Sequence, residues 1–118
     1  MPHLHLETTA DLPENADLPD ILQALVDALS KQDTIAPEAV RAHHSLRSNW
    51  VVGAGAPEGF AHLTVSAFSG RSLEWRQKVS SAMMGVLKER FQMSLEAHEV
   101  LLTVEIREME PASYLREL

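Results

Sequence analysis

Short alternations of apolar and polar residues predict the strands of this chain. In residues 3–7, Leu4 and Leu6 alternate with two histidines, a pattern typical of a strand whose two faces meet different surroundings. The strongest pattern of this kind covers residues 60–68. The predicted strands are residues 3–7, 39–46, 60–68 and 100–106, and residues 50–52 form a further short stretch that favours β structure.

Two longer segments carry apolar residues at the spacing of an α-helix. The first covers residues 18–31, with Pro19 in its first turn and Asp17 as an N-cap candidate. The second begins at Ser72 and has Glu74 in its first turn, where the helix dipole favours an acidic side chain. Each helix has one apolar stripe, made of Ile21, Leu22, Leu25, Val26 and Leu29 in the first and of Val79, Met83, Val86, Leu87 and Phe91 in the second.

The order of these elements is β-α-β followed by β-α-β, which suggests two related halves, at about residues 1–56 and 57–118, within a single domain. Parallel βαβ crossovers are right-handed, so both helices should cover one face of a four-stranded sheet. We therefore predict an α+β fold with a mixed sheet. On the sequence pattern the strand residues are too apolar to leave the other face in water, so we expect that face to pack against other subunits.

Composition and charge exclude several classes of protein. The chain has 118 residues, 45% of them apolar, and no cysteine. It therefore has no disulfide or thiolate chemistry, and a cytoplasmic location is the simplest expectation. No apolar run approaches the roughly 20 residues of a membrane span. The formal net charge of −7 has the wrong sign for a general nucleic-acid binder, so we expect neither nucleic acid nor membrane as a partner.

Two apparent motifs do not support a cofactor or metal site. The glycines of residues 53–59 resemble a phosphate-binding loop, but a strand follows them where the anion site needs a helix N-terminus, so we interpret the segment as a turn. The six histidines lack a metal-binding signature such as H-E-x-x-H. We expect no cofactor and no metal, with a metal-binding module kept as an alternative.

Three residues are candidates for chemistry on an anionic substrate. Met1 is normally removed when a small residue follows, so Pro2 would become a secondary amine at the start of a strand. Desolvation and nearby cations lower the pKa of such an amine towards neutrality, which makes it a usable general base. Arg71 precedes the N-terminus of the second helix, where arginine and free amides could hold a carboxylate. Arg41, in the third segment, is the other candidate cation.

Several segments together resemble the 5-carboxymethyl-2-hydroxymuconate isomerase family of the tautomerase superfamily. The resemblance covers nearly the whole chain, and its most specific part is the run G-R-S-L-E-x-R-Q beginning at Gly70. His43 stands where the family often has a second arginine. The segments that carry the resemblance are Met1-Pro2-His3, residues 14–19 (E-N-A-D-L-P), Val40-Arg41, residues 60–64 (F-A-H-L-T) and residues 70–77.

The resemblance implies a tautomerase-like homotrimer with an amino-terminal proline catalyst. Pro2 would take the 2-hydroxyl proton of 5-carboxymethyl-2-hydroxymuconate and return a proton to carbon 5, giving the 2-oxo-3-ene isomer in homoprotocatechuate catabolism. Arg41 and Arg71 would bind carboxylate or stabilise the developing dienolate charge. The C-terminal residues 111–118, with Tyr114 and Leu115 as candidate anchors, either pack on a neighbouring subunit or fray, and we favour packing.

Two alternatives remain open at this stage. A related proline-based tautomerase or decarboxylase would act on another 2-oxo acid substrate. A non-catalytic trimeric protein would have the same fold but would not use the Pro2 amine as a catalyst, and its function would survive Pro2→Ala.

Overall fold

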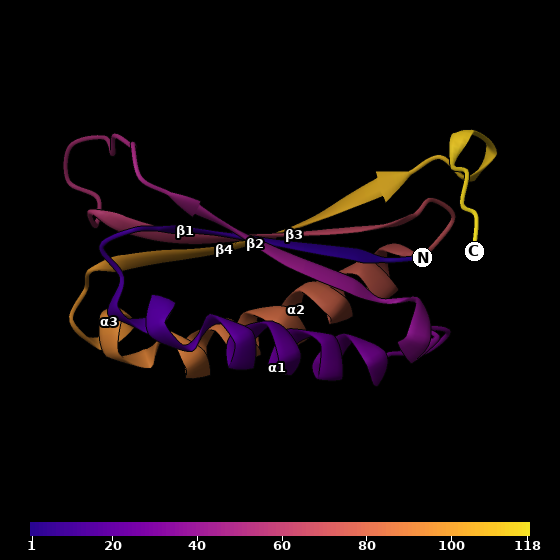
Figure 1. The fold of residues 1–118 in the computed structure, drawn as a ribbon, viewed down its shortest axis with the longest axis horizontal. Helices are drawn as coiled ribbons and strands as arrows, with labels where there is room; N and C mark the ends of the chain where they lie inside the picture. Colours follow the sequence, from indigo (N-terminus) through magenta and orange to yellow (C-terminus); the bar gives the residue numbers. More distant parts are fainter.

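The computed structural model describes all residues from Met1 to Leu118 and contains a single four-stranded sheet (Figure 1). The strand order is β2-β1-β3-β4; β1 is parallel to β2 and antiparallel to β3, and β3 is parallel to β4. The predicted α+β fold with a mixed sheet is confirmed. The elements are β1 (His3–Thr9), α1 (Leu18–Ser30), β2 (Arg41–Arg47), β3 (Gly59–Phe68), α2 (Leu73–Arg90), α3 (Gln92–Glu96) and β4 (Val100–Met109), with 3-10 turns at Pro13–Asp17, Pro37–Ala39 and Pro111–Ser113.

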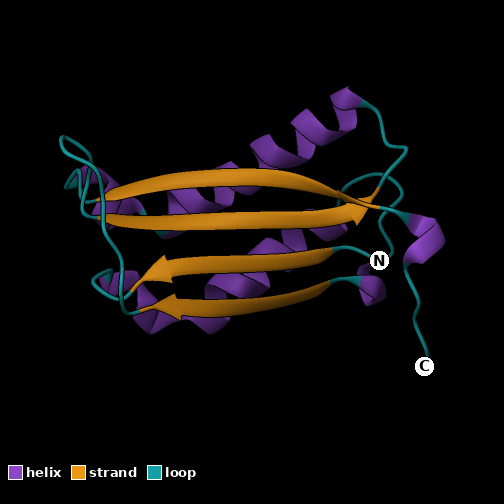
Figure 2. Ribbon diagram, turned by 90° about the horizontal axis from the view of Figure 1, so that it is seen from above, coloured by secondary structure: helices purple, strands orange, loops and turns teal.

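The two long helices lie side by side on one face of the sheet, as predicted, and Figure 2 shows them behind the strands. Both β-α-β units contribute to one core. Its fully buried side chains come from the helix-facing positions of β1 and β3 and from the apolar stripe of each helix: Leu4, Leu6, Leu63, Val65, Ile21, Leu25, Leu29, Val79, Met83, Leu87 and Phe91. The boundary between the two pseudo-repeats near residues 56 and 57 stays a prediction. No helix is long and apolar enough to cross a membrane.

The helix ends agree in part with the sequence prediction. The Ser72 side chain accepts a hydrogen bond from the Trp75 backbone N–H at 3.0 Å, which is the capping interaction expected there. Asp17 occupies the N-cap position of α1 but its side chain makes no capping bond. The short helix α3 was not predicted, because it has only five residues and no apolar period of its own.

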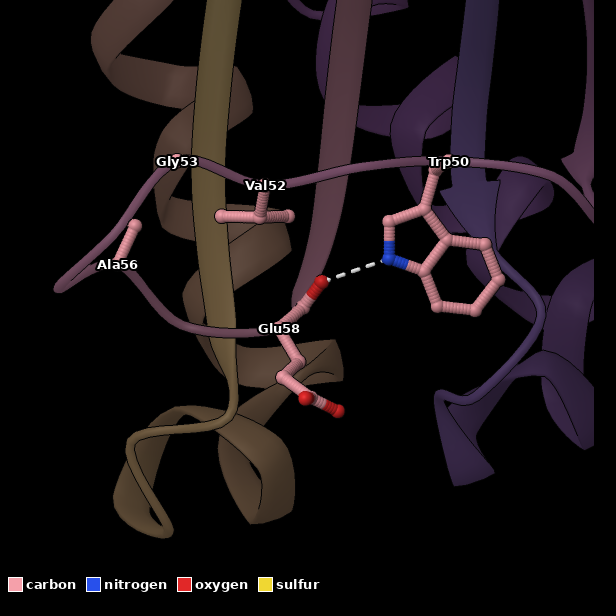
Figure 3. A pocket seen from close by; sticks show the side chains of 5 residues that line it. All are labelled: Trp50, Val52, Gly53, Ala56 and Glu58. Atoms are coloured by element: carbon pink, nitrogen blue, oxygen red, sulfur yellow. Dashed lines mark hydrogen bonds between the residues drawn. The ribbon is translucent and has the colours of Figure 1, made fainter.

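Residues 50–52 do not form a strand, so that expectation was wrong. They lie in the loop between β2 and β3, closed by a hydrogen bond of 2.8 Å from the Trp50 indole N–H to the Glu58 carbonyl (Figure 3). Val51 is 96% exposed. The glycine-containing segment is a turn, as predicted, and Gly55 has a φ of +81° that favours glycine. Strand β4 runs three residues further than predicted, to Met109.

The sheet face opposite the helices is mainly polar. The expectation that apolar residues on this face drive packing against other subunits was therefore wrong. The strand pairing places residues of alternate parity on this face, and most of them are histidines, charged residues, serines and threonines. Apolar side chains occur on it only towards the two ends of β3 and β4. This open face consists of His3, His5, Glu7, Arg41, His43, Ser45, Arg47, Phe60, His62, Thr64, Ser66, Phe68, Leu101, Thr103, Glu105, Arg107 and Met109.

A buried carboxylate joins α3 to the segment before α1. Glu14 is 5% exposed and accepts hydrogen bonds from the backbone N–H of Ser94, at 2.9 Å, and from its hydroxyl. We predict that Glu14→Gln lowers the free energy of unfolding by about 2 kcal/mol, because one acceptor would be replaced by a donor facing buried donors. Urea denaturation measures this change. Glu99→Gln, at an exposed site, is the matched control and should stay within about 0.5 kcal/mol of the parent.

Candidate active site

The start of β1 places Pro2 beside Arg41. Pro2 is buried, and its carbonyl accepts a hydrogen bond from the Arg41 backbone N–H at 3.2 Å. This bond continues the parallel pairing of β1 with β2, in which His3 is the register partner of Arg41. The Arg41 guanidinium donates to the Glu38 carbonyl at 2.9 Å and to the Val40 carbonyl at 3.2 Å, so only backbone oxygens hold it.

Arg71 approaches the same end of the molecule from the loop before α2. It follows Gly70, whose φ of +102° turns the chain out of β3. Its guanidinium carbon lies 4.1 Å from the centre of the Trp75 ring, and the guanidinium also donates to the Thr34 hydroxyl. A cation held over an aromatic face, with donors left over, is suited to binding a planar carboxylate.

The charges around the amino terminus favour a neutral amine. Burial lowers the pKa of the Met1 α-amino group, and the positive charges of Arg71 and Arg116 lower it further. Burial also lowers the pKa of His3, with smaller contributions from the amino terminus, His43 and Arg41. The smaller contributions indicate that Arg41, Arg71 and Arg116 all lie close enough to the first residues for their charges to act there.

The ion pairs of the chain separate its arginines into two groups. Arg47, Arg76, Arg90 and Arg107 each lie within 4.0 Å of a glutamate oxygen. Arg41, Arg71 and Arg116 form no ion pair, although the chain has 17 acidic residues and only 10 basic ones. Arginines left without carboxylate partners in an acidic protein are available to an anionic ligand.

The C-terminal tail adds residues that sequence reasoning did not assign to the site. The Tyr114 hydroxyl is 2.8 Å from His3 Nε2, so this candidate anchor contacts its own chain. Packing of the tail on a neighbouring subunit stays a prediction. Leu115, the other predicted anchor, is 93% exposed and contributes no such packing. Nothing in the sequence pattern pointed to Arg116, because only the folded tail brings it near the amino terminus.

Two open cavities lie at the opposite end of the sheet from Pro2. One, of about 390 Å³, is lined by the loop residues Trp50, Val52, Gly53, Ala56 and Glu58 (Figure 3). A neighbouring cavity of about 420 Å³ includes Phe60, His62 and Leu101. In Figure 1 this loop and the amino terminus lie at opposite ends of the molecule. None of the predicted site residues lines either cavity.

The histidines form pairs with neighbouring side chains. His5 stacks on His43 with ring centres 4.3 Å apart, and His62 bonds to Thr103 at 2.6 Å. No three metal-binding side chains come together in the structure. That the protein needs neither metal nor cofactor stays a prediction.

We predict that the protein becomes less stable as the pH falls below about 6.5, the ordinary pKa of histidine. Burial lowers the pKa values of His3, His5 and His44 in the folded chain. As the pH falls, these histidines therefore take up protons in the unfolded chain before they do so in the folded chain. Their contribution to stability is complete above the unfolded pKa and is lost as the pH falls through the folded pKa values. The midpoint of thermal unfolding should decrease by several degrees between pH 7.5 and 5.5. His44→Gln should reduce the decrease, whereas a change at exposed His98 should not.

Comparison with known proteins supports the family resemblance seen in the sequence. A family model described as 5-carboxymethyl-2-hydroxymuconate isomerase matches residues 2–117. The chain is 27% identical to the 5-carboxymethyl-2-hydroxymuconate Delta-isomerase of Escherichia coli over 112 residues, which are 94% of this chain and 89% of that one. A crystal structure of such an isomerase from Deinococcus radiodurans R1 superposes with a TM-score of 0.87 and 29% identity, over 98% of this chain and 88% of the other. A fused 4-OT symmetric trimer has the same fold, with a TM-score of 0.68, 22% identity and coverage of 96% and 94%.

The two β-α-β units on one mixed sheet, together with the match to the family model, place the protein in the tautomerase superfamily. Within it, the chain belongs to the 5-carboxymethyl-2-hydroxymuconate isomerase family, as its sequence motifs predicted, and it is an isomerase.

Proposed function

We propose that this isomerase converts 5-carboxymethyl-2-hydroxymuconate to its 2-oxo-3-ene isomer, with Pro2 as the general base and acid. The observation that carries the proposal is the gathering of three arginines without ion-pair partners around the buried start of β1. The substrate named by the family and by the Escherichia coli relative is a tricarboxylate, which such a cluster suits.

Pro2 would carry the proton in both steps. Removal of Met1 leaves the ring nitrogen of Pro2 as a secondary amine. Burial and positive charge, which lower the pKa of the Met1 amine, would then act on the Pro2 amine. The neutral amine takes the proton of the 2-hydroxyl group as the C2–O bond becomes a carbonyl. The resulting ammonium gives a proton to carbon 5, and the remaining double bond lies between carbons 3 and 4. No proton or electron is gained or lost overall.

Arg41 and Arg71 would supply the positive charge that this proton transfer requires. During the reaction negative charge spreads over the dienolate, and fixed guanidinium groups stabilise it without reorganising. One of them would bind the carboxylate next to the reacting hydroxyl and the other the far end of the conjugated chain. Their separate attachment, to β2 and to the loop before α2, suits two ends of one extended substrate.

We further propose that the protein is a homotrimer in the cytoplasm. Strands β2 and β4 are the two edges of the sheet, and each leaves backbone hydrogen-bonding groups unpaired. Leu46 and Leu101 on these edges are 49% and 52% exposed. A second copy would cover both features, as a closed symmetric assembly allows. The expected result of light scattering after size exclusion is three times the mass of one chain, and a monomer would contradict this.

The turnover of 5-carboxymethyl-2-hydroxymuconate, followed by its ultraviolet absorbance, tests the proposed reaction. The protein used must have an intact mass that shows loss of Met1. We expect a kcat/KM of about 10⁴ M⁻¹s⁻¹ or more, within the usual range of enzymes. Turnover no faster than in buffer would exclude this substrate for the protein.

A further inference from the structure

The C-terminal tail is fixed against the amino-terminal strand at Tyr114. After the turn at Pro111–Ser113, the Tyr114 ring meets Phe68 edge to face with centres 5.0 Å apart, and its hydroxyl lies 2.8 Å from His3 Nε2. His3 directly follows Pro2 and Phe68 ends β3, so the tyrosine contacts two elements of the site. Both chain ends accordingly lie at the same end of the molecule in Figure 1.

Arg116 follows this anchor by two residues and has no carboxylate partner in the chain. The adjacent Leu115 and Leu118 are fully or almost fully exposed, so no packing buries this part of the tail. The Arg116 charge nevertheless acts on the amino terminus, where it lowers the pKa of the Met1 amine. Because Arg116 is only two residues from Tyr114, which contacts His3 beside Pro2, the tail brings a third unpaired guanidinium to the end of the sheet that holds Pro2, Arg41 and Arg71.

We propose that Arg116 binds the carboxymethyl carboxylate of the substrate, with Tyr114 as the residue that positions the tail. This assignment rests on the proposed function. The conjugated chain of the substrate is planar and needs donors fixed on the main scaffold, which Arg41 and Arg71 provide. The carboxymethyl arm branches from that chain through a saturated carbon, so it can reach a guanidinium at the rim of the site. Three carboxylates then meet three arginines.

A comparison of two substrates tests the assignment. 2-Hydroxymuconate lacks the carboxymethyl arm, whereas 5-carboxymethyl-2-hydroxymuconate has it. We expect Arg116→Gln to lower kcat/KM for the tricarboxylate by roughly 10-fold, mainly through KM, as loss of an exposed charge-assisted contact implies. The value for the dicarboxylate should change by less than about twofold. Arg90→Gln, which removes an exposed arginine of α2 paired only with its neighbour Glu89, is the matched control and should leave both substrates unaffected.

Tyr114→Phe separates positioning from binding, because it removes the hydroxyl that meets His3 and keeps the ring against Phe68. We expect it to raise KM for the tricarboxylate alone, with kcat retained. The assignment is overturned if Arg116→Gln leaves the tricarboxylate unaffected or weakens both substrates equally. Failure of the proposed function is distinct from this, since the parent protein itself would then not turn over the tricarboxylate.

Discussion

Enclosing the Pro2 nitrogen in a peptide bond is expected to lower kcat/KM by about 10²–10⁴-fold, the usual contribution of a general base. An amide nitrogen has no available lone pair, so a protein with Gly-Ser added before Pro2 loses the base without losing any side chain. The measurement compares it with processed protein of verified mass at the same pH.

Pro2→Ala provides an intermediate case. Its processed form keeps a primary amine but lacks the ring that holds the nitrogen at the start of β1. We expect activity between those of the parent and the extended protein. Thermal unfolding of all three should agree within a few degrees, which confirms that the fold is intact. Full activity of the extended protein would exclude the amine from catalysis.

Arg71→Gln is expected to have the second largest effect, a decrease in kcat/KM of about 10- to 100-fold. The substitution removes the stacking of a cation on Trp75 and would remove the proposed charge-assisted contact with a substrate carboxylate. It also removes one of the charges that lower the pKa of the amino terminus. The amine pKa should therefore rise, and the acidic limb of the pH profile of kcat/KM should move to higher pH, because the base must be neutral to act.

Two comparisons make this result specific to Arg71. Arg71→Lys keeps the charge but not the planar pair of donors. Its acidic limb should therefore stay near that of the parent, whereas its KM should be higher than that of the parent. Arg90→Gln should change neither quantity. A profile of Arg71→Gln with the parent's acidic limb would show that Arg71 does not act on the amine.

The long helices and strands could be predicted because the spacing of their apolar residues along the sequence matches the positions that are buried. Val79, Met83 and Leu87 of the second stripe are fully buried in the core, and Ser72 caps their helix as expected. Residues 50–52 have β-forming side chains, but a local bond from Trp50 to the Glu58 carbonyl holds them in a loop. The open sheet face was predicted to be apolar from strand residues that in fact point to the helices. Which residues share a face could be assigned only once the strand register was known.

From the sequence, residues could be assigned to the candidate site only where they lie in recognisable motifs. Pro2, Arg41 and Arg71 occur in segments that resemble the family, and the structure brings them to one end of the sheet. Arg116 lies in no segment that resembles the family. Its proximity to the amino terminus depends on contacts of Tyr114 with His3 and Phe68, which are 111 and 46 residues away in the sequence. Tertiary contacts at that separation cannot be deduced from local patterns.

The most direct test of the central claim is the titration of the Pro2 nitrogen itself, followed by the ¹⁵N chemical shift of proline-labelled, processed protein. The account predicts a secondary amine whose pKa lies below the ordinary α-amino range of about 7.7–8.0, and which matches the acidic limb of kcat/KM. A nitrogen that titrates above that range, or one that does not titrate between pH 5 and 9 and leaves the acidic limb to another group, would contradict the assignment of Pro2 as the base.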